Sequence, residues 1–248
     1  MKKYGLLGYP LKHSFSRQFF TEKFERESVD ALYLNFEMPS LDGLLHIIEE
    51  EKDLAGMNVT IPYKEKIIPL LHNVDDEARQ IGAVNVIKIS RADNRIELTG
   101  YNTDIIGFQK PLELLIDKGI HNKALILGTG GASKAIYKGL INLGIEPKFV
   151  SRTFKPHAFL YDDLNERIIN EYKVIVNTSP LGTFPEVDEA PAIPYQYLTP
   201  EHLLYDLVYN PSETKFLKLG KERGAKIKNG ADMLEIQALA SWDIWNKD

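Results

Sequence analysis

A glycine-rich turn in the middle of the chain constrains the fold more than any other feature of the sequence. Residues 123–127 form an apolar run typical of a buried strand, and Gly128-Thr-Gly-Gly-Ala-Ser133 follows directly, ahead of a helical pattern. A glycine turn between a strand and a helix lets the backbone approach a pyrophosphate, whose charge then lies at the helix N-terminus. Because this motif begins near residue 123, the first half of the chain is left to bind something else.

The composition excludes several kinds of site. The 248 residues contain no cysteine, which rules out disulfides and thiolate chemistry, and the six histidines lack metal-binding spacing, so we expect no metal. The formal net charge is -5 and the basic residues are not clustered, so we expect no nucleic-acid partner. Apolar runs are too short for a bilayer span and no signal peptide is evident, which indicates a cytoplasmic protein without membrane contact.

Short apolar runs alternate with helical patterns in the first half, which predicts an α/β fold with a mainly parallel sheet covered by helices on both faces. Strands are expected at 4–7, 32–36, 54–59, 83–89 and 95–99, and helices at 17–26, 41–50 and 63–71. We expect the last two strands to form a hairpin around residues 92–94.

From residue 123 the alternation restarts, as in a Rossmann-like, doubly wound dinucleotide-binding domain. Further strands are expected at 148–150, 173–177, 203–208 and 225–228, with helices after the glycine turn, from a Ser212 cap to residue 222, and at 233–245. We expect a substrate-binding catalytic domain at 1–102 that includes a returning C-terminal helix at 231–248. The dinucleotide-binding domain then covers 103–230 with a linking helix at 103–118, and a cleft separates the two domains.

The end of the next strand indicates which dinucleotide binds. NAD-binding proteins place an acidic residue there for the ribose hydroxyls, whereas this chain has Ser151-Arg152-Thr153, followed by Lys155. A guanidinium binds a 2′-phosphate through paired, charge-assisted hydrogen bonds, and an acid would repel it. NADP(H) is therefore favoured. The plainer interpretations are that the glycine turn is only a structural tight turn and that Arg152 is only a solvated arginine at a strand end. The residues expected to hold NADP(H) are Gly128, Thr129, Gly130, Gly131, Ala132, Ser151, Arg152, Thr153 and Lys155.

Polar side chains gather where the strands of the first half end. They are Ser14, Ser16, Asn58, Thr60, Lys64, Asn85, Asn102 and Asp104. Ligands of open α/β sheets bind beyond the carboxyl ends of the strands, so this grouping suits a small polyhydroxylated molecule. Taken singly, Ser16, Thr103 and Asp104 are also explained as helix caps.

Seven sequence blocks, in order along nearly the whole chain, resemble the shikimate dehydrogenase family. They are residues 8–16, 58–64, 82–85, 100–104, the glycine turn, 177–182 and 229–237. The sequence departs from the family at Arg17, where proline is usual, and at Thr129, where alanine is usual.

The resemblance implies a reversible, NADPH-dependent reduction of 3-dehydroshikimate to shikimate in chorismate and aromatic amino-acid biosynthesis. It implies that Lys64 and Asp104 are the catalytic pair and that Gly230 lines the nicotinamide pocket. The substrate residues that it implies are Ser14, Ser16, Thr60, Asn85, Tyr209 and Gln237. Whether the enzyme is a monomer or a homodimer stays open.

Two alternatives remain at this point. One is a quinate/shikimate dehydrogenase that tolerates NAD, and the other is a catalytically silent nucleotide-binding sensor on the same scaffold. A sensor needs neither Lys64 as a proton donor nor Asp104 to orient it, so the presence of both residues argues against that alternative.

Overall fold

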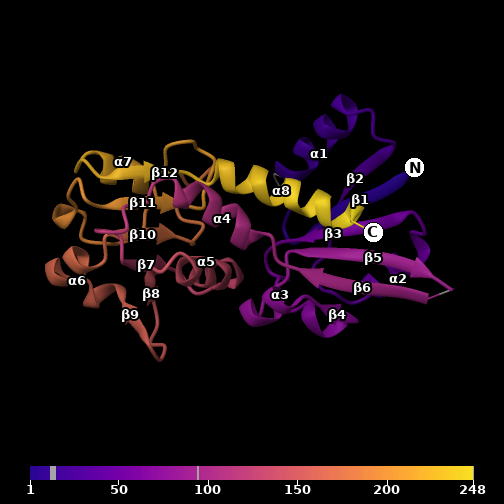
Figure 1. Ribbon diagram of the computed structural model, residues 1–248, viewed down its shortest axis with the longest axis horizontal. Helices are drawn as coiled ribbons and strands as arrows, with labels where there is room; N and C mark the ends of the chain where they lie inside the picture. The colour runs from indigo at the N-terminus through magenta and orange to yellow at the C-terminus, as the bar shows by residue number, and fades with distance from the viewer. Residues whose placement is uncertain (12–14, 94, 248) are drawn as a thin grey trace. The chain divides into compact units, whose positions relative to one another are not determined.

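The computed structural model describes residues 1–11, 15–93 and 95–247, and the chain divides into two compact units (Figure 1). Unit 1 consists of residues 1–103 and 235–248, and unit 2 of residues 104–234. The C-terminal helix, α8 (Ala231–Asn246), begins in unit 2 and ends in unit 1. Each unit has its own sheet and its own cores.

Unit 1 is built on a six-stranded sheet in the order β2-β1-β3-β5-β6-β4. Its strands are β1 (Lys2–Gly8), β2 (Ala31–Glu37), β3 (Leu54–Val59), β4 (Asn73–Val74), β5 (Val86–Ala92) and β6 (Arg95–Tyr101). The β1–β2, β1–β3 and β4–β6 pairs are parallel, whereas β3–β5 and β5–β6 are antiparallel. The expected hairpin is confirmed, although its residue Asn94 lies outside the described residues.

Helices cover both faces of this sheet, as the alternating pattern predicts. The helical segments are α1 (Phe15–Arg26), α2 (Leu44–Glu50), the 3₁₀ turn η1 (Ile68–Leu70), α3 (Asp76–Ile81) and the larger part of α8. Phe20 of α1 and Trp245 of α8 pack with Tyr4 of β1 in one core. Leu7, three residues further along β1, packs with Ile48 of α2 in another, since successive side chains of a strand point to opposite faces.

The helix expected at 63–71 is wrong. The structure has only the 3₁₀ turn η1 there, because Pro69 lacks the backbone N–H that an α-helix needs at that position. Two long-range bonds hold the segment instead: the Tyr63 hydroxyl donates to the Met38 carbonyl, and the Val84 N–H donates to the Lys64 carbonyl over 2.7 Å. Lys64 therefore lies on an irregular turn.

Unit 2 has a fully parallel six-stranded sheet in the order β12-β11-β10-β7-β8-β9. Its strands are β7 (Lys123–Leu127), β8 (Glu146–Ser151), β9 (Ala158–Leu160), β10 (Val174–Asn177), β11 (Leu203–Asp206) and β12 (Lys226–Lys228). Its helical segments are α4 (Asp104–Glu113), α5 (Gly131–Asn142), η2 (Tyr161–Asp163), α6 (Glu166–Glu171), η3 (Tyr195–Tyr197) and α7 (Lys215–Lys221).

The strand order of unit 2 reverses between β7 and β10, which is where a doubly wound sheet binds its ligand. From β7 the chain proceeds through β8 to β9 on one side, and from β10 through β11 to β12 on the other. Phe108 of α4 and Ile136 of α5 belong to one core, and Ile169 of α6 and Phe216 of α7 belong to a second one. The expected Rossmann-like fold is confirmed.

Two expected helices of unit 2 differ in their ends. The linking helix, expected at 103–118, is α4 and ends at Glu113. The expected Ser212 cap is wrong, because Thr214 caps α7 by accepting from the Leu217 N–H over 3.4 Å.

Candidate functional site

The glycine turn lies at the point where the strand order of unit 2 reverses. β7 ends at Leu127, and Gly128 then has a φ of 121°, a conformation that residues with a side chain rarely adopt. A Cβ atom at Gly128 would also lie 2.7 Å from the Thr178 Oγ1 atom. Glycine is therefore required here both for the turn and for the close packing against the segment after β10.

The helix after this turn presents an N-terminus suited to an anion. Gly130 is the N-cap of α5, and no side chain among the described residues caps the helix there. A Cβ atom built on Gly130 would meet no described atom within 4 Å, so the space beside it is open to a ligand. Backbone N–H groups at such a helix start, in Gly131 and Ala132, fit the pyrophosphate of a dinucleotide.

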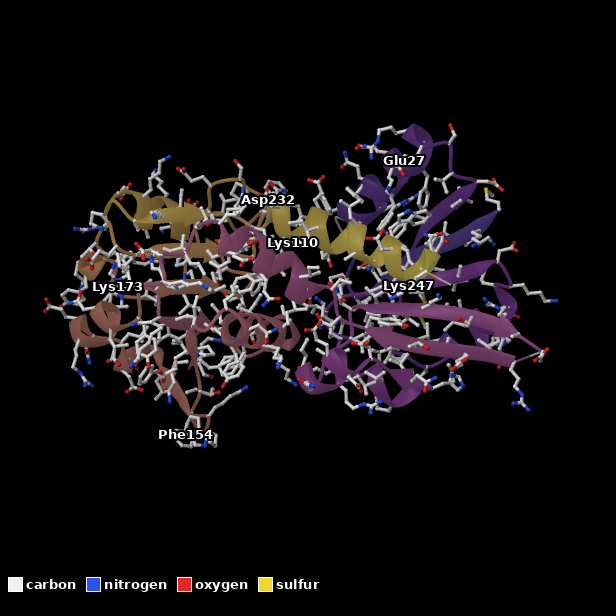
Figure 2. All side chains as sticks on the ribbon, viewed as in Figure 1. Glu27, Lys110, Phe154, Lys173, Asp232 and Lys247 are labelled. Carbon is white, nitrogen blue, oxygen red and sulfur yellow. The ribbon has the colours of Figure 1, made fainter. Side chains whose placement is uncertain are left out.

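The loop after β8 adds cationic groups to the glycine turn. The Ser151 hydroxyl accepts from the Thr153 N–H over 3.3 Å, while the Lys155 Nζ atom donates to the Thr129 Oγ1 atom over 2.7 Å. Arg152 is exposed, as is Phe154 in the same loop (Figure 2). With two cations and no carboxylate in residues 151–157, this loop suits a 2′-phosphate.

Two expected substrate residues of unit 1 are in direct contact. Asn85 is 1% exposed, and its side-chain nitrogen donates to the Gln237 Oε1 atom and to the Thr103 Oγ1 atom, over 3.0 Å in each case. Its side-chain oxygen accepts from the Thr103 N–H over 2.7 Å. Residues 152 positions apart are thereby joined at the start of β5.

A buried polar network extends from this contact. Asn58, at the end of β3, accepts from the Tyr33 hydroxyl over 2.8 Å and donates to the Ser241 hydroxyl of α8 over 2.9 Å. Ser241 in turn donates to the Gln237 carbonyl over 2.7 Å. Burial raises the pKa of the Tyr33 phenol, and its hydrogen bond with Ser16 opposes that rise. The network therefore joins α1, β2, β3 and α8 beside the expected substrate residues.

The other expected residues of unit 1 lie after β1 and β3. Thr60 follows β3 directly and is half-buried, with its N–H donating to the Leu7 carbonyl over 2.9 Å. Lys64 is also half-buried. Ser16 is buried near the start of α1, whereas Ser14 lies outside the described residues.

Three further expected residues belong to unit 2. Asp104 is buried and is the first residue of α4, where a carboxylate interacts favourably with the helix dipole. Tyr209 is half-buried in the segment after β11, and burial raises its pKa. Gly230 is buried just before α8, and its N–H donates to the Val208 carbonyl over 3.2 Å.

Sequence reasoning assigned no role to Ser241, Asp206 or Thr214. Ser241 lies four residues after Gln237, so helical spacing places both on one face of α8. Asp206 ends an apolar strand and is fully buried, with Thr214 donating to it. Asp206 could have been noticed in the sequence as an acid at the end of an apolar strand.

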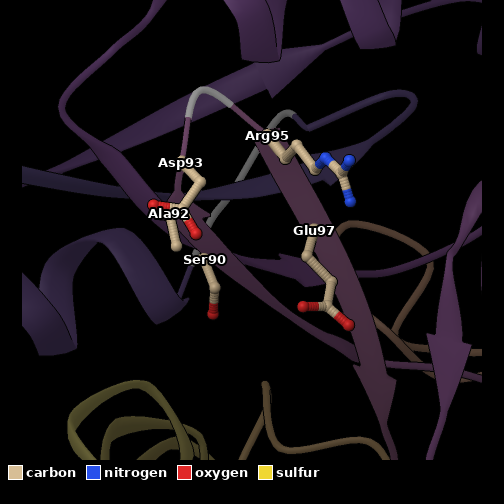
Figure 3. A pocket seen from close by; sticks show the side chains of 5 residues that line it. All are labelled: Ser90, Ala92, Asp93, Arg95 and Glu97. Atoms are coloured by element: carbon tan, nitrogen blue, oxygen red, sulfur yellow. The ribbon is translucent and has the colours of Figure 1, made fainter.

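Two pockets in unit 1 are lined by none of the expected site residues. The first, of about 390 Å³, lies on the β5–β6 hairpin and is lined by Ser90, Ala92, Asp93, Arg95 and Glu97 (Figure 3). The second, of about 480 Å³, is lined by residues of α2 and β6 and by His72. Within the described part of the chain, no cluster of His, Asp or Glu suits a metal ion, and no helix is long and apolar enough to cross a membrane.

Comparison with known proteins shows which family the chain is similar to. The model of the shikimate dehydrogenase substrate binding domain matches residues 6–87. Over 257 residues the chain is 38% identical to the shikimate dehydrogenase (NADP(+)) of Carboxydothermus hydrogenoformans, covering 97% of this chain and 90% of that protein. The chain belongs to the shikimate dehydrogenase family.

Solved structures of the family agree with the fold. The shikimate dehydrogenase of Aquifex aeolicus matches with a TM-score of 0.87 and 35% identity, over 100% of this chain and 93% of that one. The shikimate 5-dehydrogenase of Thermus thermophilus, solved with NADP(H) and shikimate, matches with a TM-score of 0.83 and 29% identity, over 99% and 94%. The family resemblance expected from the seven sequence blocks is confirmed.

Proposed function

We propose that this chain is an NADP-dependent shikimate dehydrogenase that interconverts 3-dehydroshikimate and shikimate, a step of aromatic amino-acid biosynthesis. The observation that carries the proposal is a glycine turn joined to a cationic, acid-free loop after β8 through the Lys155–Thr129 bond. It occurs in a chain whose full-length relatives are named shikimate dehydrogenase (NADP(+)).

The cofactor is held by unit 2 in this proposal. Gly130 and the first amides of α5 bind the pyrophosphate, since the space beside Gly130 is open to an anion, and Gly128 forms the turn that precedes them. Arg152 and Lys155 bind the 2′-phosphate, with Ser151, Thr153 and Thr129 shaping the same loop. Gly230 lies at the nicotinamide end.

The substrate is a small polyhydroxylated acid, and we assign its contacts to short polar side chains. They are Ser14, Ser16, Thr60, Asn85, Gln237 and Tyr209. The Asn85–Gln237 hydrogen bond supports this assignment, because it fixes two amide groups that suit ring hydroxyls at one place. Both ligands are water-soluble, and we place the enzyme in the cytoplasm.

The proton is handled by Lys64 and Asp104. The bound nicotinamide supplies or accepts the hydride. In reduction, the Lys64 ammonium donates a proton to the carbonyl oxygen of 3-dehydroshikimate, and in oxidation the neutral amine accepts the proton of the hydroxyl. Asp104 orients the lysine and the substrate from the first position of α4.

The direct test is absorbance at the nicotinamide band with purified protein, shikimate and NADP⁺. We expect reduced cofactor to accumulate with shikimate and not without it. A protein that binds NADP⁺ but does not oxidise shikimate would contradict the proposal and favour the silent-sensor alternative.

A further inference from the structure

Asp206 is a buried acid that the proposed mechanism does not use. It ends β11, is 0% exposed, and both of its carboxylate oxygens accept hydrogen bonds. The Oδ1 atom accepts from the Asn177 side chain over 2.9 Å and from the Val208 N–H over 3.0 Å, and the Oδ2 atom accepts from the Thr214 hydroxyl over 2.5 Å. Three segments of unit 2 therefore meet at this carboxylate.

One of these segments, at Val208, leads to two residues of the proposed site. Asn177 ends β10, beside the point where the strand order reverses, and its carbonyl accepts from the Leu207 N–H over 3.0 Å. Val208 precedes Tyr209, and its carbonyl accepts from the Gly230 N–H over 3.2 Å. The hydrogen bond from Val208 to Asp206 therefore restrains the backbone that carries Tyr209 and that accepts from Gly230.

The packing around Gly230 leaves this backbone little freedom. A Cβ atom at position 230 would overlap the carbonyl of Leu207, so the two chain segments touch directly. The Asn229 side chain donates to the Ser212 carbonyl over 2.9 Å, and the Phe184 N–H donates to the Asn210 carbonyl over 3.0 Å. The segment 207–212, which follows Asp206 directly, is therefore hydrogen-bonded to residues 177, 184, 229 and 230.

We propose that Asp206 is a positioning residue whose carboxylate holds the 207–214 segment so that Tyr209 and Gly230 contact the substrate and the nicotinamide. This proposal rests on the function proposed above. A carboxylate suits the position because all three partners are donors, and only a group with acceptors at both ends satisfies them together.

A purely structural role accounts less well for an acid here. Burial raises the pKa of Asp206 to about 6, against the opposing hydrogen bonds from Thr214, Val208 and Asn177, so burying the charge carries a cost to folding. Residues that violate the usual preferences of a core tend to lie at functional sites. The geometry at Asp206 agrees with that rule.

The test is Asp206→Asn, which keeps the size of the side chain but replaces the Oδ2 acceptor with an N–H donor facing Thr214. We expect the KM for shikimate and the Kd for NADP⁺ to rise by about tenfold, with kcat changed less than about threefold. The Kd for adenosine 2′,5′-bisphosphate, which has no nicotinamide, should stay within about twofold. Asp162→Asn, which neutralises an exposed acid of the same unit, is the matched control.

Thr214 supplies a second test if Asp206→Asn fails to fold. Thr214→Ser keeps the hydroxyl and should behave as the unmodified enzyme, whereas Thr214→Val removes it and should reproduce the selective loss. Equal loss of affinity for NADP⁺ and for the bisphosphate, or no loss for either, would overturn the proposal. If the unmodified protein does not oxidise shikimate, the proposed function fails, and the two binding constants still decide the role of Asp206.

Discussion

Arg152 stands in the position after β8 where NAD-binding proteins carry an acid, and the two cofactors differ by one phosphate. We expect Arg152→Asp to lower kcat/KM with NADP⁺ by about 30- to 150-fold, because losing an arginine–phosphate contact costs roughly 2–3 kcal/mol. Steady-state rates with NADP⁺ and NAD⁺ measure this. Arg167→Asp, an equal charge change at an exposed residue of α6, is the control and should change neither rate. An unchanged preference in Arg152→Asp would show that the 2′-phosphate binds elsewhere.

Lys64 and Asp104 are expected to act as one unit in proton transfer. Lys64→Ala should lower kcat by roughly 10²- to 10⁴-fold, the usual contribution of a positioned acid or base, with the Kd for NADP⁺ little changed. Lys66→Ala, an exposed lysine on the same turn, is the control.

Asp104→Asn tests the other half of this pair. It keeps the shape of the side chain but loses the charge, so kcat should also fall. The double variant should lose less than the product of the single losses. Strictly multiplicative losses would mean that the two residues act independently.

At the scale of single elements, α8 carries part of the network that holds Asn85 and Gln237, the two amides proposed to bind the substrate. Ser241→Ala removes the hydroxyl that accepts from Asn58 and leaves a buried donor without its partner, which should cost about 1–3 kcal/mol in unfolding free energy. The KM for shikimate should rise with it, because Asn85 and Gln237 lose support. Asn246→Ala, exposed near the end of the same helix, is the control. Stability and KM that both match the control would contradict this role.

The sequence predicted the elements whose patterns are long and regular. The strand at 54–59 is confirmed to the residue, and the hairpin of β5 and β6 is confirmed with strands at 86–92 and 95–101 in place of the expected 83–89 and 95–99. α3 and α6, each of six residues, were not predicted, because they are too short to show helical periodicity and are marked only by their caps, Asp75 and Asn165. Pro69 prevents the helix predicted at 63–71. Thr214, in place of the predicted Ser212, caps α7, and its hydroxyl also donates to Asp206.

The residues of the candidate site likewise fall into two groups, those that local sequence features reveal and those that only the fold reveals. Glycines, the cationic loop and the polar residues after strands are local features, so the sequence showed them. Ser241 and Asp206 acquire their roles only through partners distant along the chain, 183 residues away for Asn58 and Ser241 and 29 for Asn177 and Asp206. No local pattern encodes such pairings, and packing of the whole chain is needed to see them.

At the scale of the whole molecule, Asp206 makes stability depend on pH. Its pKa of about 6 in the folded protein lies above the ordinary 3.8, so the folded chain holds this proton more tightly than the unfolded chain does. The resulting stabilisation is complete below about pH 4 and is lost as the pH rises through 6, amounting to roughly 3 kcal/mol.

Urea unfolding of the unmodified protein and of Asp206→Asn measures this loss as a difference between the two. Between pH 4 and pH 7 that difference should move by roughly 3 kcal/mol toward the variant, since the other groups titrate alike in both proteins. Asp162→Asn, at an exposed acid of the same unit, is the control. A difference between the unmodified protein and Asp206→Asn that stays constant with pH would mean that Asp206 titrates normally.

We propose a dehydrogenase specific for NADP and shikimate, and kcat/KM for shikimate and for quinate, each with NADP⁺ and with NAD⁺, measures this specificity directly. Quinate carries an additional hydroxyl on a tetrahedral ring carbon, and burying that hydroxyl without a partner costs about 1–3 kcal/mol. We expect shikimate to exceed quinate by at least about tenfold, and NADP⁺ to exceed NAD⁺ by a similar factor or more. Comparable values for both acids and both cofactors would contradict this specificity and favour a quinate/shikimate dehydrogenase with relaxed cofactor use.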